Sequence, residues 1–239
     1  MSMNLRILTY NIHKGVSWKI PLSSIQRIQT QIQHLEADII FLQEVRGSQY
    51  KMIQPEYCPH YAYGKNVVYS KGHHGNAIYS KYPIIFSNNL DISMHRLEHR
   101  GLLHSVIQLP KNSQPLHLLC THLGLFAKGR LKQLEMIMQY VNDNIPVNAP
   151  IILGGDFNDW KEHATNKLIK SLDFQEAFLN IYQSYAKTYP AWKPTFKLDR
   201  LYFRGFNVNY ANSLSLHPWR NLSDHIALEV SLKLNVLSS

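Results

Sequence analysis

Two segments of the sequence repeat one pattern, and this repeat restricts the fold more than any other feature. In each segment an apolar strand ends in polar residues, an amphipathic helix follows, and a second apolar strand leads into an acidic residue. The first segment places Asn11 and Glu44 at its two strand ends, and the second places His122 and Asp156 at the equivalent positions. Two such units can face each other across a pseudo-two-fold axis, which would bring the polar strand ends into one cleft.

Short apolar runs separated by polar turns continue along the remaining chain. Such runs predict strands, whereas apolar residues that recur every three or four positions predict helices. The predicted strands are 5–12, 37–42, 76–80, 84–90, 102–109, 116–120, 150–153, 200–203, 206–210 and 226–232, and the predicted helices are 21–35, 131–141 and 167–172. The hairpin-like strands of the second half indicate sheets of mixed direction with helices outside them. This pattern favours an α/β sandwich over an open doubly wound sheet.

The composition is that of a folded globular chain. Of the 239 residues 45% are hydrophobic and 17% are charged, which excludes a disordered chain. Two cysteines are too few for a disulfide framework or a cysteine-based zinc site. At this length we expect one domain spanning residues 1–239. The sequence shows neither an apolar run long enough to cross a bilayer nor a signal peptide, so we expect a cytoplasmic protein.

The charge balance is strongly basic. The chain carries 25 Lys and Arg against 16 Asp and Glu, which gives a formal net charge of +9. This excess predicts an anionic partner, namely nucleic acid, a phospholipid surface or a phosphorylated small molecule. A generally basic surface without such a partner is the alternative. We expect the protein to be a monomer.

Four acidic residues stand directly beside apolar strands rather than in polar turns. They are Glu44, Asp156, Asp199 and Asp224. A carboxylate at the end of a core strand is costly unless it is paired or binds a metal ion. Each one alone also fits a cap or a buried hydrogen-bond acceptor. Together with Asn11, Asn158 and His225 they favour an oxygen-rich site for Mg²⁺ or Mn²⁺.

Six short motifs then occur in a fixed order. They are Leu-Thr-Tyr-Asn-Ile at 8–12, Leu-Gln-Glu at 42–44, Gly-Asn-Ala-Ile at 75–78, Thr-His-Leu at 121–123, Gly-Gly-Asp-Phe-Asn at 154–158 and Ser-Asp-His at 223–225. This ordered set resembles the endonuclease/exonuclease/phosphatase superfamily, which contains pancreatic-type DNases, abasic-site endonucleases, inositol-polyphosphate phosphatases and neutral sphingomyelinases. The resemblance covers residues 5–232 and is strongest to a bacterial branch often encoded near cardiolipin synthase. It implies the DNase I-like fold, a four-layer αββα sandwich of two packed mixed β-sheets with outer helices.

The resemblance also implies a metal site. Glu44 would be the principal ligand of a Mg²⁺ ion, which neutralises phosphate charge and stabilises the leaving oxygen. Asp224 would help through the metal or its water molecules. Asn11 would either bind near the metal or support Asp156.

The same resemblance implies catalytic roles for five residues. Asp199 and His225 would form a dyad in which the carboxylate orients the imidazole and raises its pKa. Asp156 would orient or deprotonate the attacking water, while Asn158 holds phosphate and water in line. His122 would donate to a non-bridging phosphate oxygen. Whether Asp156 or His225 is the general base stays open at this point.

Three further residues are candidates for contacts with the substrate phosphate. Arg100 has the side chain for a bidentate clamp, although it also fits a surface arginine at a strand start. Trp160 fits either an aromatic rim of the cleft or a packing lid over a loop. Asn76 belongs to the third motif and is the third candidate.

The sequence also departs from some branches of the superfamily. Abasic-site endonucleases have Tyr at the position of His122, which argues against abasic-site repair. The chain shows no hydrophobic membrane hairpin of the kind that secreted sphingomyelinases carry, which argues against sphingomyelin. We therefore expect a divalent-metal-dependent phosphoesterase that hydrolyses a phosphodiester of nucleic acid or of a phospholipid. The alternatives are a phosphomonoesterase acting on a phosphorylated small molecule or inositol lipid, and a catalytically inactive module that binds nucleic acid or lipid.

Overall fold

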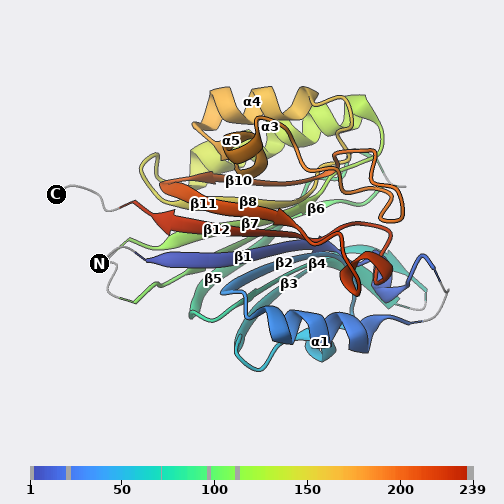
Figure 1. Cartoon of the computed structure of the whole chain (residues 1–239). Helices are drawn as coiled ribbons and strands as arrows, with labels where there is room; N and C mark the ends of the chain where they lie inside the picture. The colour runs from blue at the N-terminus through green and yellow to red at the C-terminus, as the bar shows by residue number, and fades with distance from the viewer. Residues whose placement is uncertain (1–2, 20–22, 71, 96–97, 111–113, 236–239) are drawn as a thin grey trace.

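Two six-stranded β-sheets pack face to face in the computed structural model, with helices on both outer faces (Figure 1). The structure describes residues 3–19, 23–70, 72–95, 98–110 and 114–235. Both sheets contain parallel and antiparallel neighbours. The predicted αββα sandwich of mixed sheets is therefore confirmed.

The two sheets have the same plan. In spatial order the first contains β11 (Phe206–Ser213), β12 (Leu228–Leu234), β1 (Asn4–Asn11), β2 (Ile39–Arg46), β4 (Gly72–Ser80) and β3 (His60–Tyr69). The second contains β5 (Ile84–Asp91), β6 (Gly101–Ile107), β7 (Leu116–His122), β8 (Ile151–Asp156), β10 (Asp199–Arg204) and β9 (Gln175–Glu176). The helices are α1 (Ile25–Leu35), α2 (Tyr50–Ile53), α3 (Ala127–Asn144), α4 (His163–Leu172) and α5 (Ala177–Tyr182), with 3₁₀ turns at His13–Gly15 and Trp219–Asn221.

The predicted repeat forms the centre of each sheet. Strands β1 and β2 are parallel neighbours joined through α1, and β7 and β8 are parallel neighbours joined through α3. Tyr10 pairs with Leu42 in the first unit, and His122 pairs with Asp156 in the second. Because parallel strands end at the same edge of a sheet, each unit delivers its polar strand ends to one end of the sandwich.

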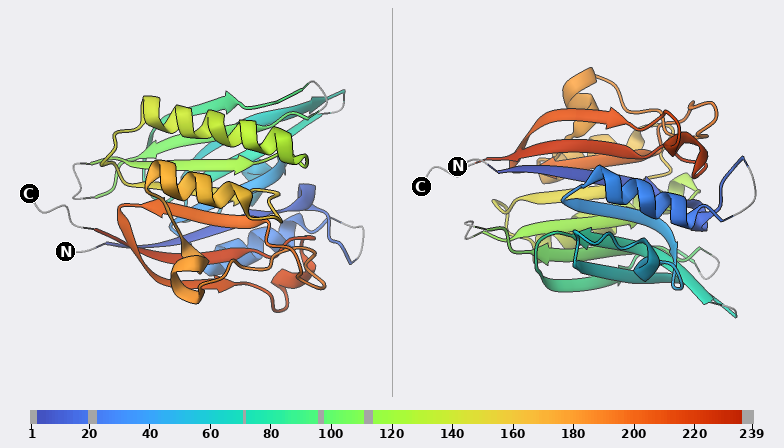
Figure 2. Two further views of the ribbon diagram at one scale, coloured as in Figure 1. Left: turned by 90° about the horizontal axis from the view of Figure 1, so that it is seen from above. Right: turned by 60° about the horizontal axis from the view of Figure 1, so that its bottom comes forward.

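Three apolar layers hold the sandwich together. The layer between the sheets is built from inward-facing residues of both, such as Phe41, Ile152 and Leu228. Helix α1 buries Ile28 and Ile32 against the outer face of the first sheet. Helices α3 and α4 cover the outer face of the second (Figure 2). The spacing of apolar residues along each helix therefore decides which face turns inward.

Several element predictions differ from the structure: α2, α5 and β9 were not predicted, and two further differences have a clear physical reason. The predicted helix at 21–35 begins at Ile25, because Ser24 is held in the preceding loop by hydrogen bonds to the carbonyl oxygens of Gly15 and Leu222. Residues 21 and 22 of that prediction lie outside the described residues. Strand β3 was not predicted, because it is an edge strand that is only partly buried and lacks a clear alternation of apolar and polar residues. Among the described residues no helix is long and apolar enough to cross a membrane.

A buried histidine pair joins β6, β7 and α3. The Nε2 atom of His104 lies 3.0 Å from Nδ1 of His117, and Nδ1 of His104 lies 3.0 Å from the hydroxyl of Tyr140. Burial, together with the positive charge of a protonated His117, lowers the pKa of His104 to about 4. Burial lowers the pKa of His117 as well. The pair is therefore neutral in the folded protein near pH 7.

We predict that this pair makes folding sensitive to mild acid. The pKa of His104 is lower in the folded than in the unfolded chain, so its contribution to stability is complete above about pH 6.5 and falls toward pH 4. The loss is on the order of 3 kcal/mol. Urea unfolding at pH 7.5 and pH 5 should show the stability gap between wild type and His104→Leu shrinking in acid. A gap that does not change with pH would contradict the prediction.

Candidate active site

A cavity of about 410 Å³ opens at the end of the sandwich where the four central parallel strands finish. Strand β1 begins and β12 ends at the opposite end of the molecule (Figure 1). All the predicted site residues except Asp199 and Asn76 line this cavity, although they come from distant parts of the chain. Asp199 lies directly behind His225, as described below.

Glu44 reaches the cavity through an irregularity in β2. The pairing of β2 with β4 shifts between Leu42 and Val45, so that Gln43 and Glu44 together oppose Asn76. Glu44 itself has a φ of 58°, in the left-handed region that residues with a Cβ rarely adopt. A bulge of this kind changes the direction of a side chain relative to the regular strand alternation. The backbone strain at Glu44 is therefore localised on the residue that we expected to bind the metal.

The Glu44 carboxylate is already paired with a cation of the chain. Its Oε2 atom lies 2.8 Å from Nζ of Lys14, and its Oε1 atom lies 3.9 Å from Nδ1 of His122. Burial alone would raise the pKa of Glu44, but the positive charges of His122 and Lys14 lower it to about 2. Because His122 is itself neutral near pH 7, Lys14 supplies the positive charge at that pH. Glu44 is thus ionised across the physiological range.

Asp156 is the centre of the hydrogen-bond network. Its Oδ2 atom accepts a hydrogen bond from Nδ2 of Asn11 at 3.0 Å and lies 3.5 Å from Nε2 of His122 and 3.6 Å from Nε2 of His225. Its Oδ1 atom accepts from the backbone N–H of Asn158 at 2.9 Å. Asn11 therefore contacts Asp156 directly, which fits the expectation that Asn11 supports Asp156.

The expected dyad of Asp199 and His225 is present. Oδ2 of Asp199 lies 2.8 Å from Nδ1 of His225. The hydroxyl of Thr188 accepts hydrogen bonds from the backbone N–H groups of Leu198 and Asp199, and the ring of Tyr189 lies 4.9 Å from that of His225. These contacts leave the imidazole one free nitrogen, Nε2, which faces Asp156.

The two cavity histidines have opposite protonation states. Burial alone would lower the pKa of His225, but three carboxylates, led by that of Asp199, outweigh burial and raise it to about 10. Burial lowers the pKa of His122 to about 4, against the opposing attraction of Asp156. Near pH 7 the cavity therefore holds one cationic and one neutral imidazole about the same carboxylate.

The donor atoms fit a hard divalent cation. Asp156, Asp199 and His225 lie with one possible ligand atom each within 4.8 Å of the others, although His225 is protonated near pH 7 and contacts Asp199 through Nδ1. The buried Oδ1 atom of Asp199 has no hydrogen-bond partner among the described residues. Glu44 and Asp224 add two more carboxylates to the cavity wall. A set of this kind, dominated by oxygen and without sulfur, is typical of Mg²⁺ or Mn²⁺ sites.

The remaining candidates take different positions. Arg100 lines the cavity, with its Nε donating to the carbonyl oxygen of Leu123 at 3.2 Å. Trp160 lines the cavity and is 45% exposed, which fits the rim rather than a packing lid. Asn158 also donates to Leu123, from its side-chain amide at 2.9 Å. Asn76 lies between the sheets instead, and its amide donates to the carbonyl oxygens of Gly101 and Cys120.

Sequence reasoning missed several residues at this site. Lys14 contacts Glu44, whereas Leu125, Tyr189, Phe196 and Leu198 line the cavity. All of these lie in loops or turns, where no periodicity marks a side chain as functional. In the sequence, only Lys14 could have been recognised as a site residue, because it is basic and lies three positions after Asn11.

Comparisons with known proteins bear on the family and the fold. A model of the Endonuclease/Exonuclease/phosphatase family matches residues 8–225. The uncharacterized protein YbhP of Escherichia coli K12 is 34% identical over an alignment of 246 positions that covers 97% of each chain. Among solved structures, a mannosyl-6-phosphatase from Bacteroides thetaiotaomicron has a TM-score of 0.78 at 19% identity, covering 95% of this chain and 99% of that one. TDP2 of D. rerio, complexed with a single-strand DNA product, has a TM-score of 0.75 at 17% identity, covering 96% and 98%.

These likenesses to solved structures show the fold, and the family model and YbhP show the family. The match to the family model spans both repeat units, from Leu8 in β1 to His225. It thus includes every residue that contacts Asp156. The chain belongs to the endonuclease/exonuclease/phosphatase family.

Proposed function

We propose that the protein hydrolyses a phosphodiester by in-line attack of water, with a divalent metal ion as cofactor. One observation carries the proposal: Asp156 lies on the cavity wall with two imidazoles and an amide within 3.6 Å of one carboxylate oxygen. The groups about that oxygen differ in charge and in protonation state. Such an arrangement suits proton transfer beside a phosphate better than it suits binding alone.

The metal would be held by Glu44, with Asn11 and Asp224 contributing oxygen atoms. When bound, Mg²⁺ or Mn²⁺ supplies neutralisation of phosphate charge and stabilisation of the leaving oxygen. Glu44 requires no deprotonation before binding, because its pKa is about 2. The ion pair of Glu44 with Lys14 supports this assignment, because the carboxylate already attracts a positive charge in the folded protein.

The protonation states favour Asp156 over His225 as general base. A histidine with a pKa of about 10 holds its proton at neutral pH and cannot accept another. His225 therefore donates from Nε2 to the phosphate, and Asp199 keeps that nitrogen aimed at the cavity. Asp156 accepts the proton of the attacking water, with Asn11 holding its carboxylate in place.

The remaining residues position the phosphate. His122 is neutral near pH 7 and donates one N–H to a non-bridging oxygen. We assign the side-chain oxygen of Asn158 to the attacking water. Arg100 and Trp160 line the cavity. The guanidinium of Arg100 contacts phosphate oxygens, and the indole of Trp160 contacts the organic group esterified to the phosphate.

The first prediction from the proposed function concerns catalysis itself. With Mg²⁺ or Mn²⁺ the protein should hydrolyse bis(p-nitrophenyl) phosphate, and EDTA should abolish the reaction. Asp156→Asn should lower kcat by about 10²- to 10⁴-fold, because the base is lost. Glu44→Gln should also lower activity strongly and should raise the metal concentration needed for half-maximal rate. The release of p-nitrophenol measures each rate.

Asp143→Asn provides the matched control, because Asp143 is an exposed acid on α3. This variant should retain wild-type activity. Faster turnover of p-nitrophenyl phosphate than of the diester would overturn the preference for phosphodiesters and favour a phosphomonoesterase. Wild-type activity in both Asp156→Asn and Glu44→Gln would overturn the proposed site.

The second prediction concerns the role of Asp199. In protein freed of metal with EDTA, Asp199→Asn should lower the pKa of His225 by about one unit or more, because the closest negative charge is removed. NMR titration of the imidazole nitrogens measures this shift. The pKa of His122 should change much less, since the decisive effect on it is burial. An unchanged pKa for His225 would contradict the dyad.

The third prediction concerns Lys14. Replacing it with Met removes the cation that competes for Glu44, so Mn²⁺ should bind a few-fold more tightly, in line with ~0.5–1 kcal/mol for a partly exposed ion pair. Calorimetric titration of the protein with Mn²⁺ alone tests this without reference to turnover. Lys167→Met, which breaks an ion pair with Glu135 on the helical layer, is the control. Weaker binding in Lys14→Met would contradict the competition.

A further inference from the structure

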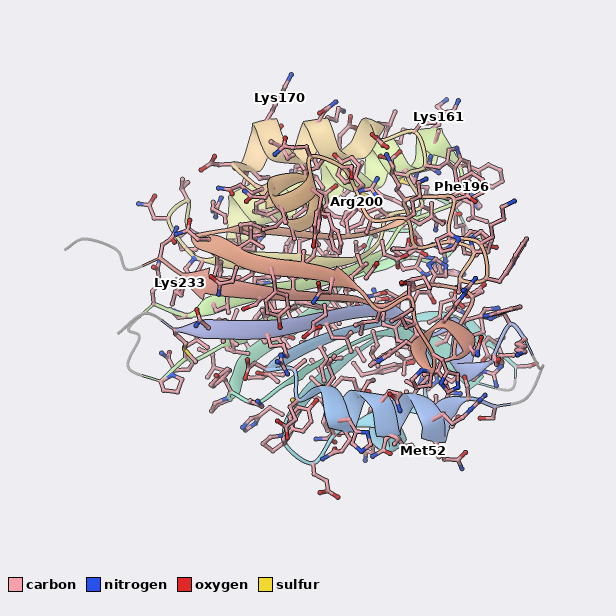
Figure 3. The ribbon with its side chains drawn as sticks, in the orientation of Figure 1. Met52, Lys161, Lys170, Phe196, Arg200 and Lys233 are labelled. Atoms are coloured by element: carbon pink, nitrogen blue, oxygen red, sulfur yellow. The ribbon has the colours of Figure 1, made fainter. Side chains whose placement is uncertain are left out.

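The loops around the cavity form one end of the molecule. Strands β1, β2, β7 and β8 end there, and their antiparallel neighbours β4, β6, β10 and β12 begin there. We call the described residues of 12–24, 47–49, 69–72, 92–100, 123–128, 157–162, 183–198 and 214–227 the rim loops. Figure 3 labels Phe196 and Lys161 at this end and Lys233 at the opposite one.

Large apolar side chains are exposed on several rim loops. Six of them are Leu125, Phe126, Trp160, Trp192, Phe196 and Leu216. Leu216 is 80% exposed and Phe126 is 68% exposed, so they are not packed in a core. Leu125, Trp160 and Phe196 line the cavity, whereas the other three lie outside its lining. The apolar surface therefore extends from the cavity wall onto the loops around it.

The exposed charges of the rim loops are positive. The exposed cations are Lys19, Lys128, Lys161, Lys187, Lys193 and Arg220. The acidic residues described in these loops are withdrawn from the surface or neutralised. Glu98 and Asp159 are buried, Asp224 lines the cavity, and Glu162 is ion-paired with Lys197 at 2.7 Å. The acidic cavity is thus surrounded by a basic and apolar rim.

We propose that the rim loops bind the surface of an anionic phospholipid bilayer and bring the cavity to a phosphodiester in a lipid head group. The second half of this statement rests on the proposed function. Lysine and arginine are attracted to anionic head groups, while tryptophan, phenylalanine and leucine insert at the boundary between head groups and acyl chains. The rim loops expose both kinds of side chain around one opening.

The aliphatic side chains favour a bilayer over single-stranded nucleic acid. Bases stack on aromatic rings, which Trp160 and Phe196 provide, but Leu125 and Leu216 cannot stack. Leu216 and Trp192 also lie outside the cavity, where a strand held in the cleft would not need them. The surface of a bilayer can contact all of these separated side chains at the same time, whereas a nucleic-acid strand bound in the cavity cannot.

Vesicle sedimentation with the full chain tests the proposal. Wild type should bind phosphatidylcholine vesicles that contain about 30% phosphatidylglycerol and should bind pure phosphatidylcholine about tenfold more weakly. The double variant Phe126→Ser/Leu216→Ser should bind the anionic vesicles about tenfold more weakly than wild type. Lys128→Gln/Lys193→Gln should lose most of the preference for anionic lipid.

The control is Val147→Ser. Val147 is 79% exposed and lies in the turn before β8, at the opposite end of the strands, so this variant should bind vesicles as wild type does. Failure of wild type to bind, or equal losses in Val147→Ser and in the double variant, would overturn the proposal. So would tighter binding to a single-stranded oligonucleotide that depends on Phe126 and Leu216.

A soluble substrate separates this proposal from the proposed function. The double variant should hydrolyse bis(p-nitrophenyl) phosphate at the wild-type rate, because neither residue lines the cavity. Normal vesicle binding by a wild type without esterase activity would overturn the proposed function while supporting the docking surface. Esterase activity in a wild type that does not bind vesicles would overturn the docking surface while supporting the proposed function.

Discussion

The organisation of the site depends on the contacts of one group, the buried carboxylate of Asp156. One oxygen of a residue in the second sheet meets Asn11 from the first sheet, His122 from the neighbouring strand and His225 from the loop before β12. A buried carboxylate is costly unless donors surround it. The ends of β1, β7 and β8 must therefore stay in register with one another, and the two repeat units are joined at the place where chemistry is expected.

Charged groups surround Asp156 both in direct contact with it and in the loops around the cavity. Close to Asp156, burial keeps His122 neutral while the carboxylate of Asp199 keeps His225 protonated, although both rings approach the same oxygen. Farther away, an acidic cavity opens within loops whose exposed charges are positive. Under the proposed function, a phosphate substrate would be attracted by the outer cations and would meet the carboxylates only where a metal ion and protonated groups compensate for their charge.

Regular elements of the fold could be predicted from the sequence, and irregular ones could not. The apolar spacing in α1 and the continuous apolar run before Glu44 both reflect burial. Burial of a regular element produces a pattern among residues close together in the sequence, so it can be recognised locally. The start of α1 depends instead on hydrogen bonds from Ser24 to residues far along the chain, including Leu222. Strand β3 lies at an edge, where burial is incomplete and leaves a weak pattern.

The sequence by itself determined the repeat, the mixed sandwich and the identity of the acids, amides and histidines at the strand ends. These follow from local periodicity and from the high cost of placing polar residues beside core strands. Only the tertiary structure decided that Glu44 turns through a bulge onto Lys14 and that Asn76 joins the sheets instead of lining the cavity. Those outcomes depend on contacts between residues far apart in the chain, and no local pattern records them.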